Sequence, residues 1–213
     1  MAARYALHGI WASGPTYKVG LMLALTGTPF DYVHVDMMKG AHKQPDFLAL
    51  NRFGQVPCLQ DRATGLTMSQ SSAILEYLAE TSGAFVGASP AERQAAREWV
   101  HWGNDRLSRG IYRSRAARFG FMKLGEDVAA HYSKEGEAAL KELDGHMAGR
   151  DWLAGGAGPT FADVDLYGVI AYAGHGGFDV AAYPNVAAWA ARIEALPGFA
   201  GIDALLPKES RTA

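Results

Sequence analysis

Residues 51–78 read NRFGQVPCLQDRATGLTMSQSSAILEYL, and the rest of the predicted fold is organised around them. This stretch predicts a strand, a hairpin turn, a second strand and the start of a helix, at Cys58–Gln60, Arg62–Gly65, Leu66–Met68 and Ala73–Leu78. Pro57 has no N–H for a sheet ladder, so it fits a strand start where something other than a neighbouring strand approaches the backbone. A cis Val56–Pro57 bond would turn the Val56 N–H and C=O outward, where an extended ligand could pair with them.

The helix of this stretch begins with a polar cluster. Ser69-Gln70-Ser71-Ser72 directly precedes the apolar-periodic run that starts at Ala73. The first N–H groups of a helix have no partner within it, and the helix dipole is positive at that end. The cluster therefore predicts a site that attracts a carboxylate.

Three short motifs of this region occur in a fixed order: His42-Lys43, the heptapeptide 51–57 and Gln70-Ser71-Ser72-Ala73-Ile74. Together they resemble the HK, NPFGQVP and ESxAI motifs of phi-like glutathione transferases. The resemblance implies a thioredoxin-like, glutathione-binding first domain, followed by an all-helical domain, and a homodimer.

The pattern upstream agrees with an α/β first domain over residues 1–83. Tyr5–Trp11 and Phe30–Asp36 predict two strands. Between them a helix is expected, with Gly14 as its cap and Pro15 at its first position. A strand–helix–strand unit of this length predicts parallel pairing.

After a linker at 84–88, residues 89–213 predict an all-helical domain. Helices are expected from Pro90 to about Arg115, over Glu126–Met147, from Phe161 to about Ala173, and from Pro184–Asn185 onward. Ser89 and Thr160 open two of them as capping boxes with Glu92 and Asp163. The tail after Pro207 is expected to fray.

Composition excludes several classes of function. The 213 residues carry a net charge of −2, and the sequence pI is near 6.4. The chain therefore lacks the excess of basic residues that is typical of a nucleic-acid-binding protein. No apolar run is long enough to span a membrane, and the histidines have no metal-ligand spacing. The single cysteine, Cys58, fits a reducing compartment, so we expect a cytoplasmic protein without a metal.

Ser13 lies at the break between the first strand and the first helix. The resemblance implies that it is the catalytic serine, which stabilises the thiolate of glutathione. A free thiol has a pKa near 8.5, so a hydroxyl donor and a helix N-terminus would favour the thiolate. Without the resemblance, Ser13 would read as an ordinary helix cap. Thr16, Tyr17 and Tyr5 remain alternative donors.

The resemblance also implies the residues that hold the glutathione co-substrate. The cationic pair at 42–43 would bind the glycine carboxylate, and the side chain of the residue at 55 and the backbone of the residue at 56 would reach the cysteinyl part. The γ-glutamyl end would lie at the start of the later helix. The set comprises His42, Lys43, Gln55, Val56, Gln70 and Ser71.

Two positions depart from the family pattern. Gln70 replaces a glutamate, which removes a negative charge facing the substrate amine and predicts weaker or altered glutathione binding. Arg52 replaces a proline, which affects loop rigidity more than chemistry. Asp105 is a candidate to compensate for the missing charge across a dimer.

The second substrate is expected between the domains. The aromatic candidates to line its site are Trp11, Trp102, Tyr112 and Phe119, although aromatic residues at helical spacing are more often core. Arg109, Arg113, Arg115 and Arg118 form a basic cluster that favours a solvated face and leaves an anionic co-substrate open. Cys58 is expected in the core, because no C-x-x-C motif accompanies it.

The sequence thus predicts a glutathione transferase in which Ser13 activates glutathione for attack on a small hydrophobic electrophile. A different glutathione-dependent reaction, such as isomerisation, peroxide reduction or dehalogenation, would need Ser13 as well. A non-catalytic ligand carrier with the same fold is the second alternative, and Gln70 is the feature that favours it most.

Overall fold

The computed structural model describes residues 2–213, which form two compact units. One unit contains the chain up to Ser82 together with Leu196–Ala213, and the other contains Gly83–Ala195. The last residues therefore pack with the first unit, whereas the sequence analysis assigned them to the helical domain.

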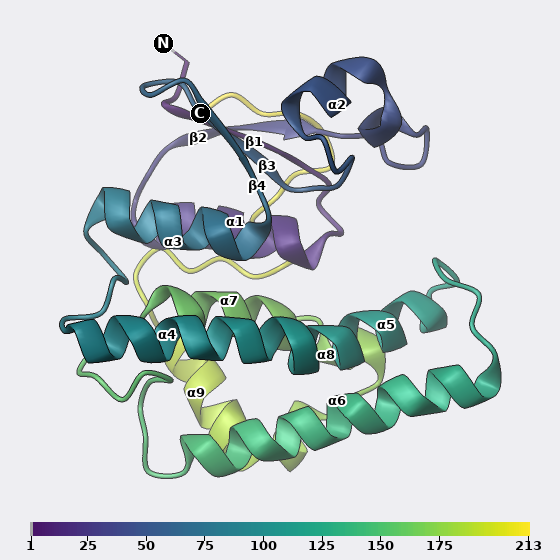
Figure 1. Ribbon diagram of the computed structural model, residues 1–213, viewed down its shortest axis with the longest axis vertical. Helices are drawn as coiled ribbons and strands as arrows, with labels where there is room; N and C mark the ends of the chain where they lie inside the picture. The colour runs from purple at the N-terminus through teal and green to yellow at the C-terminus, as the bar shows by residue number, and fades with distance from the viewer. Residues whose placement is uncertain (1) are drawn as a thin grey trace. The chain divides into compact units, whose positions relative to one another are not determined.

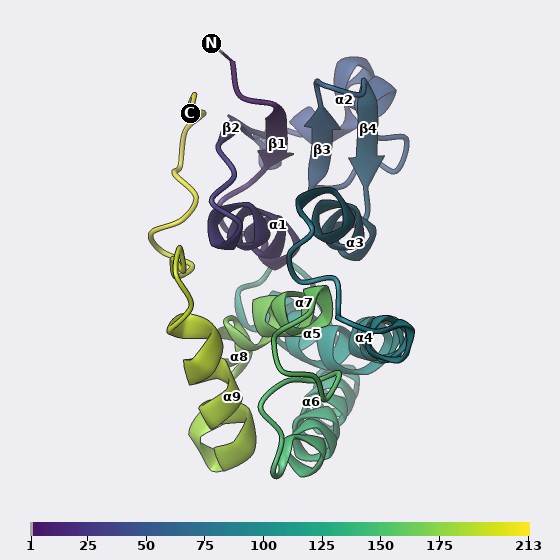
Figure 2. The same cartoon turned by 90° about the vertical axis from the view of Figure 1, so that its left-hand side faces the viewer.

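The first unit is built on a four-stranded sheet. Its elements in chain order are β1 (Tyr5–Gly9), α1 (Gly14–Leu25), β2 (Phe30–His34), the 3-10 turn η1 (Ala41–Lys43), α2 (Pro45–Leu50), β3 (Cys58–Asp61), β4 (Leu66–Ser69) and α3 (Ser71–Ser82). The strand order is β2-β1-β3-β4, with β1 parallel to β2 and β3 antiparallel to both neighbours. Helices α1 and α3 cover one face of the sheet and α2 the other (Figures 1 and 2). The expected α/β fold of this part is confirmed.

Helix α1 is buried on almost every side. Its residues from Val19 to Leu23 are fully inaccessible, because the helix packs both on the sheet and on α3. A smaller apolar cluster of Val35, Phe47 and Cys58 lies under α2. The sheet therefore has two apolar faces, as a three-layer arrangement requires.

The end of the chain continues the sheet at β2. The backbones of Tyr32 and Arg211 exchange two hydrogen bonds of 2.7 and 2.8 Å in an antiparallel bridge. Ser210 Oγ accepts from the His34 N–H, and the N–H of Ala213 donates to Asp31. The expectation that the tail frays is wrong, since β2 is an edge strand whose unpaired N–H and C=O groups the tail satisfies.

The second unit is helical. Its elements are α4 (Pro90–Trp102), the π-helical turn η2 (Gly103–Leu107), α5 (Ser108–Arg118), α6 (Glu126–Met147), α7 (Phe161–Ile170), α8 (Ala173–Gly176), the 3-10 turn η3 (Val180–Ala182) and α9 (Pro184–Glu194). The long helix expected to end near Arg115 instead contains a π-helical turn, which sequence propensity does not signal, and runs on to Arg118. The helix expected to reach Ala173 ends at Ile170.

Both predicted helix starts are present in this unit. Ser89 Oγ accepts from the Glu92 N–H at 3.1 Å, and Thr160 and Asp163 form the expected capping box. Asp163 is completely buried and also accepts from the Leu153 N–H and from Trp189 Nε1. The box therefore joins the loop before α7 to α9.

Within the described residues, no helix is long and apolar enough to cross a membrane. Over the same range, no three His, Cys, Asp or Glu side chains are grouped as metal ligands.

Candidate functional site

One end of the sheet collects the predicted glutathione-binding segments. His8 near the end of β1 pairs with Cys58 at the start of β3, and Cys58 also pairs with Ser69 at the end of β4. The segment that contains Ser13 follows β1, and the one that contains Gln70 follows β4. The antiparallel pairing of β3 therefore brings three segments to the same end of the sheet: the one with Ser13, the loop before β3 and the one with Gln70. Helices α1 and α3 both begin at this end of the sheet, so the positive ends of two helix dipoles lie there.

Ser13 is the N-cap of α1, a place that the sequence analysis gave to Gly14. Its Oγ accepts a hydrogen bond of 3.2 Å from the Thr16 N–H, and Gly14 is already helical. The capping bond uses a lone pair of the hydroxyl oxygen and leaves its proton available to another acceptor. The ordinary cap and a thiolate donor are therefore compatible roles for the same atom.

The three alternative hydroxyl donors are all buried. Thr16 is fully inaccessible, and its methyl and hydroxyl face Gly9. The Tyr17 hydroxyl donates to Ala200 O at 2.9 Å, and Tyr5 is only 3% exposed. Ser13, which is partly exposed, is the one member of the predicted set that a solvent-borne thiol can reach.

The loop between α2 and β3 is fixed by hydrogen bonds and close packing. Asn51, 2% exposed, donates from its side chain to Gln55 O at 2.6 Å and accepts from the Phe53 N–H. Gly54 has a φ of +55°, and a Cβ there would lie only 3.0 Å from the backbone oxygen of His42. Only glycine suits this position, both for its conformation and for its space.

The predicted cations lie against the same loop. Lys43 Nζ donates to Gly54 O at 2.9 Å. His42 in η1 has a buried Nδ1 without a hydrogen-bond partner among residues 2–213. Sequence reasoning named both cations but not Asn51 or Gly54, which hold the loop. The motif NRFGQVP could have indicated the role of Asn51 and Gly54, since Asn and Gly are residues that turns favour.

Gln70 and Ser71 form the start of α3. Gln70 O accepts from the Ile74 N–H, and Ser71 is the first helical residue. The φ of Gln70 is +71°, a left-handed conformation that costs a non-glycine residue about 1 kcal/mol or more. Its Nε2 lies 3.4 Å from Gln55 Oε1. Hydrogen bonds thus link the segments that contain Lys43, Gln55, Val56, Gln70 and Ser71. The Val56–Pro57 peptide bond is cis.

Cys58 does not belong to this surface. It is fully buried in the apolar cluster with Val35 and Phe47, and burial raises the pKa of its thiol to about 11. A thiol of this kind is protonated at neutral pH and out of reach of solvent, so the prediction of a core cysteine is confirmed.

The four aromatic residues predicted for the second-substrate site fall into different surroundings. Trp11 belongs to the first unit, and the Lys208 ammonium lies 5.1 Å from its ring centroid. Trp102 Nε1 donates to Glu142, and its ring packs against Trp99. The other two lie near α8 and the turn before it. Tyr112 contacts the ring of Tyr172, and Phe119 contacts that of His175. Within the helical unit, therefore, Trp102 lies apart from the other two.

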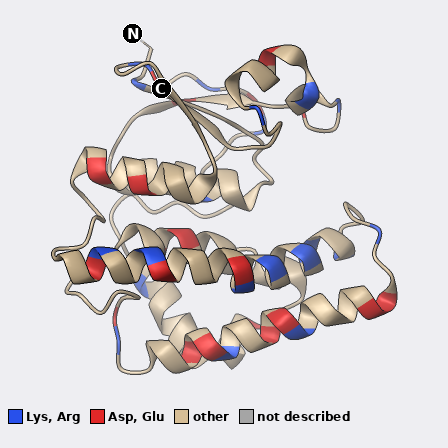
Figure 3. Ribbon diagram, in the orientation of Figure 1, with Lys and Arg blue, Asp and Glu red and all other residues tan. Residues whose placement is uncertain are grey.

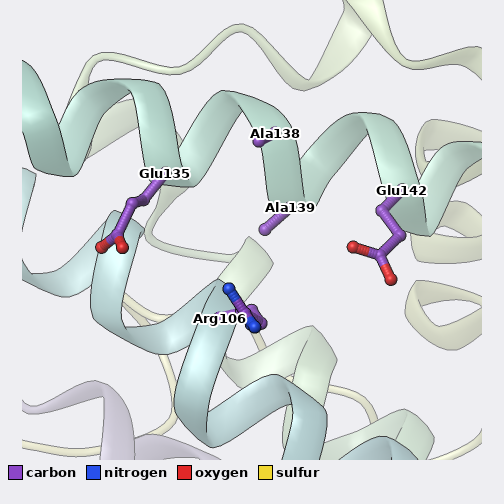
Figure 4. A pocket seen from close by; sticks show the side chains of 5 residues that line it. All are labelled: Arg106, Glu135, Ala138, Ala139 and Glu142. Atoms are coloured by element: carbon purple, nitrogen blue, oxygen red, sulfur yellow. The ribbon is translucent and has the colours of Figure 1, made fainter.

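A small cavity of about 100 Å³ lies between η2 and α6, where sequence reasoning expected nothing (Figure 4). It is lined by Arg106, Glu135, Ala138, Ala139 and Glu142. Binding pockets for small molecules usually exceed about 300 Å³, so this one is too small for a tripeptide. Asp105 beside it is exposed and forms an ion pair of 3.1 Å with Arg106.

Comparison with known proteins identifies the class. Residues 3–80 match the model of the glutathione S-transferase N-terminal domain, and residues 126–192 match that of the C-terminal domain. The chain therefore belongs to the glutathione S-transferase family.

Individual relatives agree with this assignment over nearly the whole chain. Glutathione S-transferase 3 of Zea mays is 33% identical over 216 residues, which cover 94% of each chain. Maleylacetoacetate isomerase of Rhizobium meliloti is 32% identical and covers 96% of this chain and 95% of its own. The crystal structure of a glutathione S-transferase from Pseudomonas fluorescens superposes with a TM-score of 0.87, at 28% identity, over 94% of this chain and 99% of that one.

Proposed function

We propose that the protein is a glutathione transferase in which the Ser13 hydroxyl donates a hydrogen bond to the glutathione sulfur and favours its thiolate. The observation that carries the proposal is the capping geometry of Ser13, whose oxygen accepts from Thr16 N–H while its proton stays available. The N-terminus of α1 adds a positive partial charge at the same place. The thiolate then attacks a small hydrophobic electrophile.

The glutathione tripeptide would lie at the end of the sheet where the Ser13 segment, the loop before β3 and the Gln70 segment meet. The Ser71 N–H and hydroxyl are suited to the γ-glutamyl carboxylate, because they are at a helix N-terminus. The Val56 backbone would pair with the cysteinyl unit, with the Gln55 side chain beside it. Lys43 and His42 would attract the glycine carboxylate. Burial and hydrogen bonding of Asn51 support a preformed loop for this contact.

A homodimer in the cytoplasm completes the proposal. Leu48 of α2 and Phe53 in the following loop are 38% and 45% exposed, so both side chains present apolar surface to solvent. A second copy of the chain would cover them. Light scattering of the wild type and of Phe53→Ser measures this: a monomeric wild type contradicts the proposed dimer.

The test of the mechanism is the ultraviolet absorbance of the bound thiolate across pH. We expect the thiol pKa of bound glutathione to lie well below its free value in the wild type and to return toward it in Ser13→Ala. Because Ala also weakens the cap by about 1 kcal/mol, Ser13→Gly serves as a second variant, since glycine caps nearly as well as serine.

Thr16→Val is the matched control. It removes a hydroxyl from the same helix start at nearly constant volume, and Thr16 Oγ1 is buried without a hydrogen-bond partner among residues 2–213. The thiol pKa should stay at the wild-type value in this variant. Glutathione binding without a lowered pKa in the wild type would reject the Ser13 mechanism and favour a ligand carrier.

Glutathione-dependent isomerisation is a second candidate, favoured by the similarity to a maleylacetoacetate isomerase over 96% of the chain. An isomerase returns glutathione unchanged, whereas a transferase consumes it. Measuring free thiol during turnover of an activated olefin therefore separates the two reactions, and both require Ser13.

A further inference from the structure

Arg115 differs from the other arginines of α5, which Figure 3 shows as a row of basic residues. Arg109 pairs with Glu135 at 3.2 Å, and Arg113 reaches Met122 Sδ from an exposed position. The guanidinium of Arg115 lies over two rings, 4.5 Å from the centroid of Tyr172 and 5.6 Å from that of Phe119, whereas the exposed Arg109 lies over the ring of Tyr132, at 5.9 Å. The expectation of a solvated basic face therefore fails for Arg115 alone.

The rings around this guanidinium contact one another. His175 of α8 lies 5.6 Å from both the Phe119 and the Tyr172 ring, centroid to centroid. Phe121 stacks on Phe119 at 6.0 Å with 12° between the ring planes. Phe119 and Phe121 are 52% and 64% exposed, so the aromatic cluster reaches the surface of the helical unit.

The chemistry of this cluster suits one kind of ligand. Burial strips water from the guanidinium and lowers the pKa of Arg115, although arginine still stays charged at neutral pH. A partly dehydrated guanidinium attracts an anion more strongly than a solvated one, and its planar donors match the two oxygens of a carboxylate. The exposed rings of Phe119 and Phe121 offer flat apolar surface on which a planar body can stack.

We propose that Arg115, Phe119 and His175 form a subsite for a planar aromatic or unsaturated substrate that carries a carboxylate, with the buried ring of Tyr172 supporting the guanidinium from below. Arg115 binds the carboxylate, and the exposed rings bind the planar body. This subsite deepens the proposed transferase function, because it names the class of electrophile as anionic rather than merely hydrophobic.

The test compares two ligands of nearly equal shape, the anionic 4-chloro-3,5-dinitrobenzoate and the neutral 4-chloro-3,5-dinitrobenzamide. Calorimetry without glutathione gives their dissociation constants for the wild type. We expect the carboxylate to bind about tenfold more tightly than the amide. Equal affinities would overturn the proposal.

Two charge-removing variants of the same helix locate the effect. Arg115→Gln should abolish the preference for the carboxylate, whereas Arg113→Gln, which removes the same charge from an exposed position, should retain it. An equal loss in both variants would show a general effect of net charge and overturn the subsite. Arg115→Lys keeps the charge but not the planar fork, so it should lower the preference severalfold; an unchanged preference would contradict the role of Arg115.

Turnover separates this proposal from the proposed function. In the transferase reaction the glutathione sulfur bonds to C4 of the ring and chloride leaves, and this step needs Ser13 for either ligand. If the enzyme converts the benzamide and Arg115→Gln leaves that rate unchanged, the transferase function holds whatever the carboxylate result. If the carboxylate preference in binding persists without turnover, the subsite holds and the transferase function fails.

Discussion

Each unit of the protein contains a buried aspartate that accepts four hydrogen bonds, and the two carboxylates respond to burial in opposite ways. Asp61 accepts from Arg4 Nε and Nη2 at 2.9 and 2.6 Å, from the Ala63 N–H and from the Tyr77 hydroxyl. Asp163 accepts from the N–H groups of Leu153 and Thr160, the Thr160 hydroxyl and Trp189 Nε1.

The difference between them is one cation. The Arg4 guanidinium, followed by the Tyr77 hydroxyl, holds the pKa of the Asp61 carboxyl well below its usual range, against the effect of burial. Burial raises the pKa of Asp163, because its donors are neutral and only partly offset the loss of water. The number of hydrogen bonds therefore does not decide the preferred charge of a buried carboxyl group; a paired cation does.

The largest effect is expected from Asp163→Ala. It leaves the buried N–H groups of Thr160 and Leu153 and the Trp189 indole without acceptors, so the free energy of unfolding should fall by about 3–5 kcal/mol. Urea unfolding measures this. Asp144→Ala is the control, because Asp144 caps α9 at a half-exposed site and should cost only about 1–2 kcal/mol. Equal losses of unfolding free energy in the two variants would contradict the larger contribution expected from the buried capping box.

Asp61→Asn should show its effect in the pH dependence of stability. The folded-state pKa of Asp61 is depressed, so its contribution is present above its ordinary pKa of 3.8 and is lost as the pH falls below it. The wild type should therefore lose more unfolding free energy than Asp61→Asn between pH 6 and pH 3. Parallel profiles would reject the role of the Arg4 pair.

For Asp163 the sign is reversed. Its folded-state pKa is raised, so the proton binds more tightly in the folded protein. Its contribution is present below the ordinary pKa and is lost as the pH rises through the folded pKa. Asp163→Asn, if it folds, should thus lose more stability on acidification than the wild type, which is the opposite of Asp61→Asn.

Deleting residues 210–213 tests a smaller contribution to the first unit. The deletion removes the two Tyr32–Arg211 backbone bonds and the contact of Ser210 with His34 N–H, so stability should fall by about 1–3 kcal/mol. Hydrogen exchange at the Tyr32 amide should accelerate. Ser210→Ala keeps the backbone pairing and should leave this amide protected; rapid exchange there in the intact wild type would show that the tail is not bound.

The smallest effect concerns Gln70→Glu. A carboxylate at the position proposed to face the glutathione amine should tighten binding about two- to tenfold, an effect that added salt reduces. Thr67→Glu adds the same charge at an exposed position of β4 and should change affinity less. Unchanged affinity in Gln70→Glu would mean that the amine does not lie near this side chain.

Much of the first unit could be predicted from local pattern. The strands, the turn at 62–65 and the start of α3 follow from alternation, glycine and proline, and the predicted capping boxes begin α4 and α7. The precise cap of α1 was missed, because Ser13 and Gly14 both suit that position by type and only backbone angles separate them. The alternative donors Thr16, Tyr17 and Tyr5 stayed open for a similar reason, since burial is not a local property.

Local patterns were enough to predict the family, the α/β and all-helical parts and the segments proposed to bind glutathione, because motifs and hydrophobic periods lie within short windows of sequence. Three other features depend on long-range packing. Packing joined the tail to β2, placed Arg115 over the rings of Tyr172 and Phe119, and gave Asp61 and Asp163 opposite pKa shifts. Each depends on partners that are far away in sequence and on the water that packing removes, neither of which a local pattern contains.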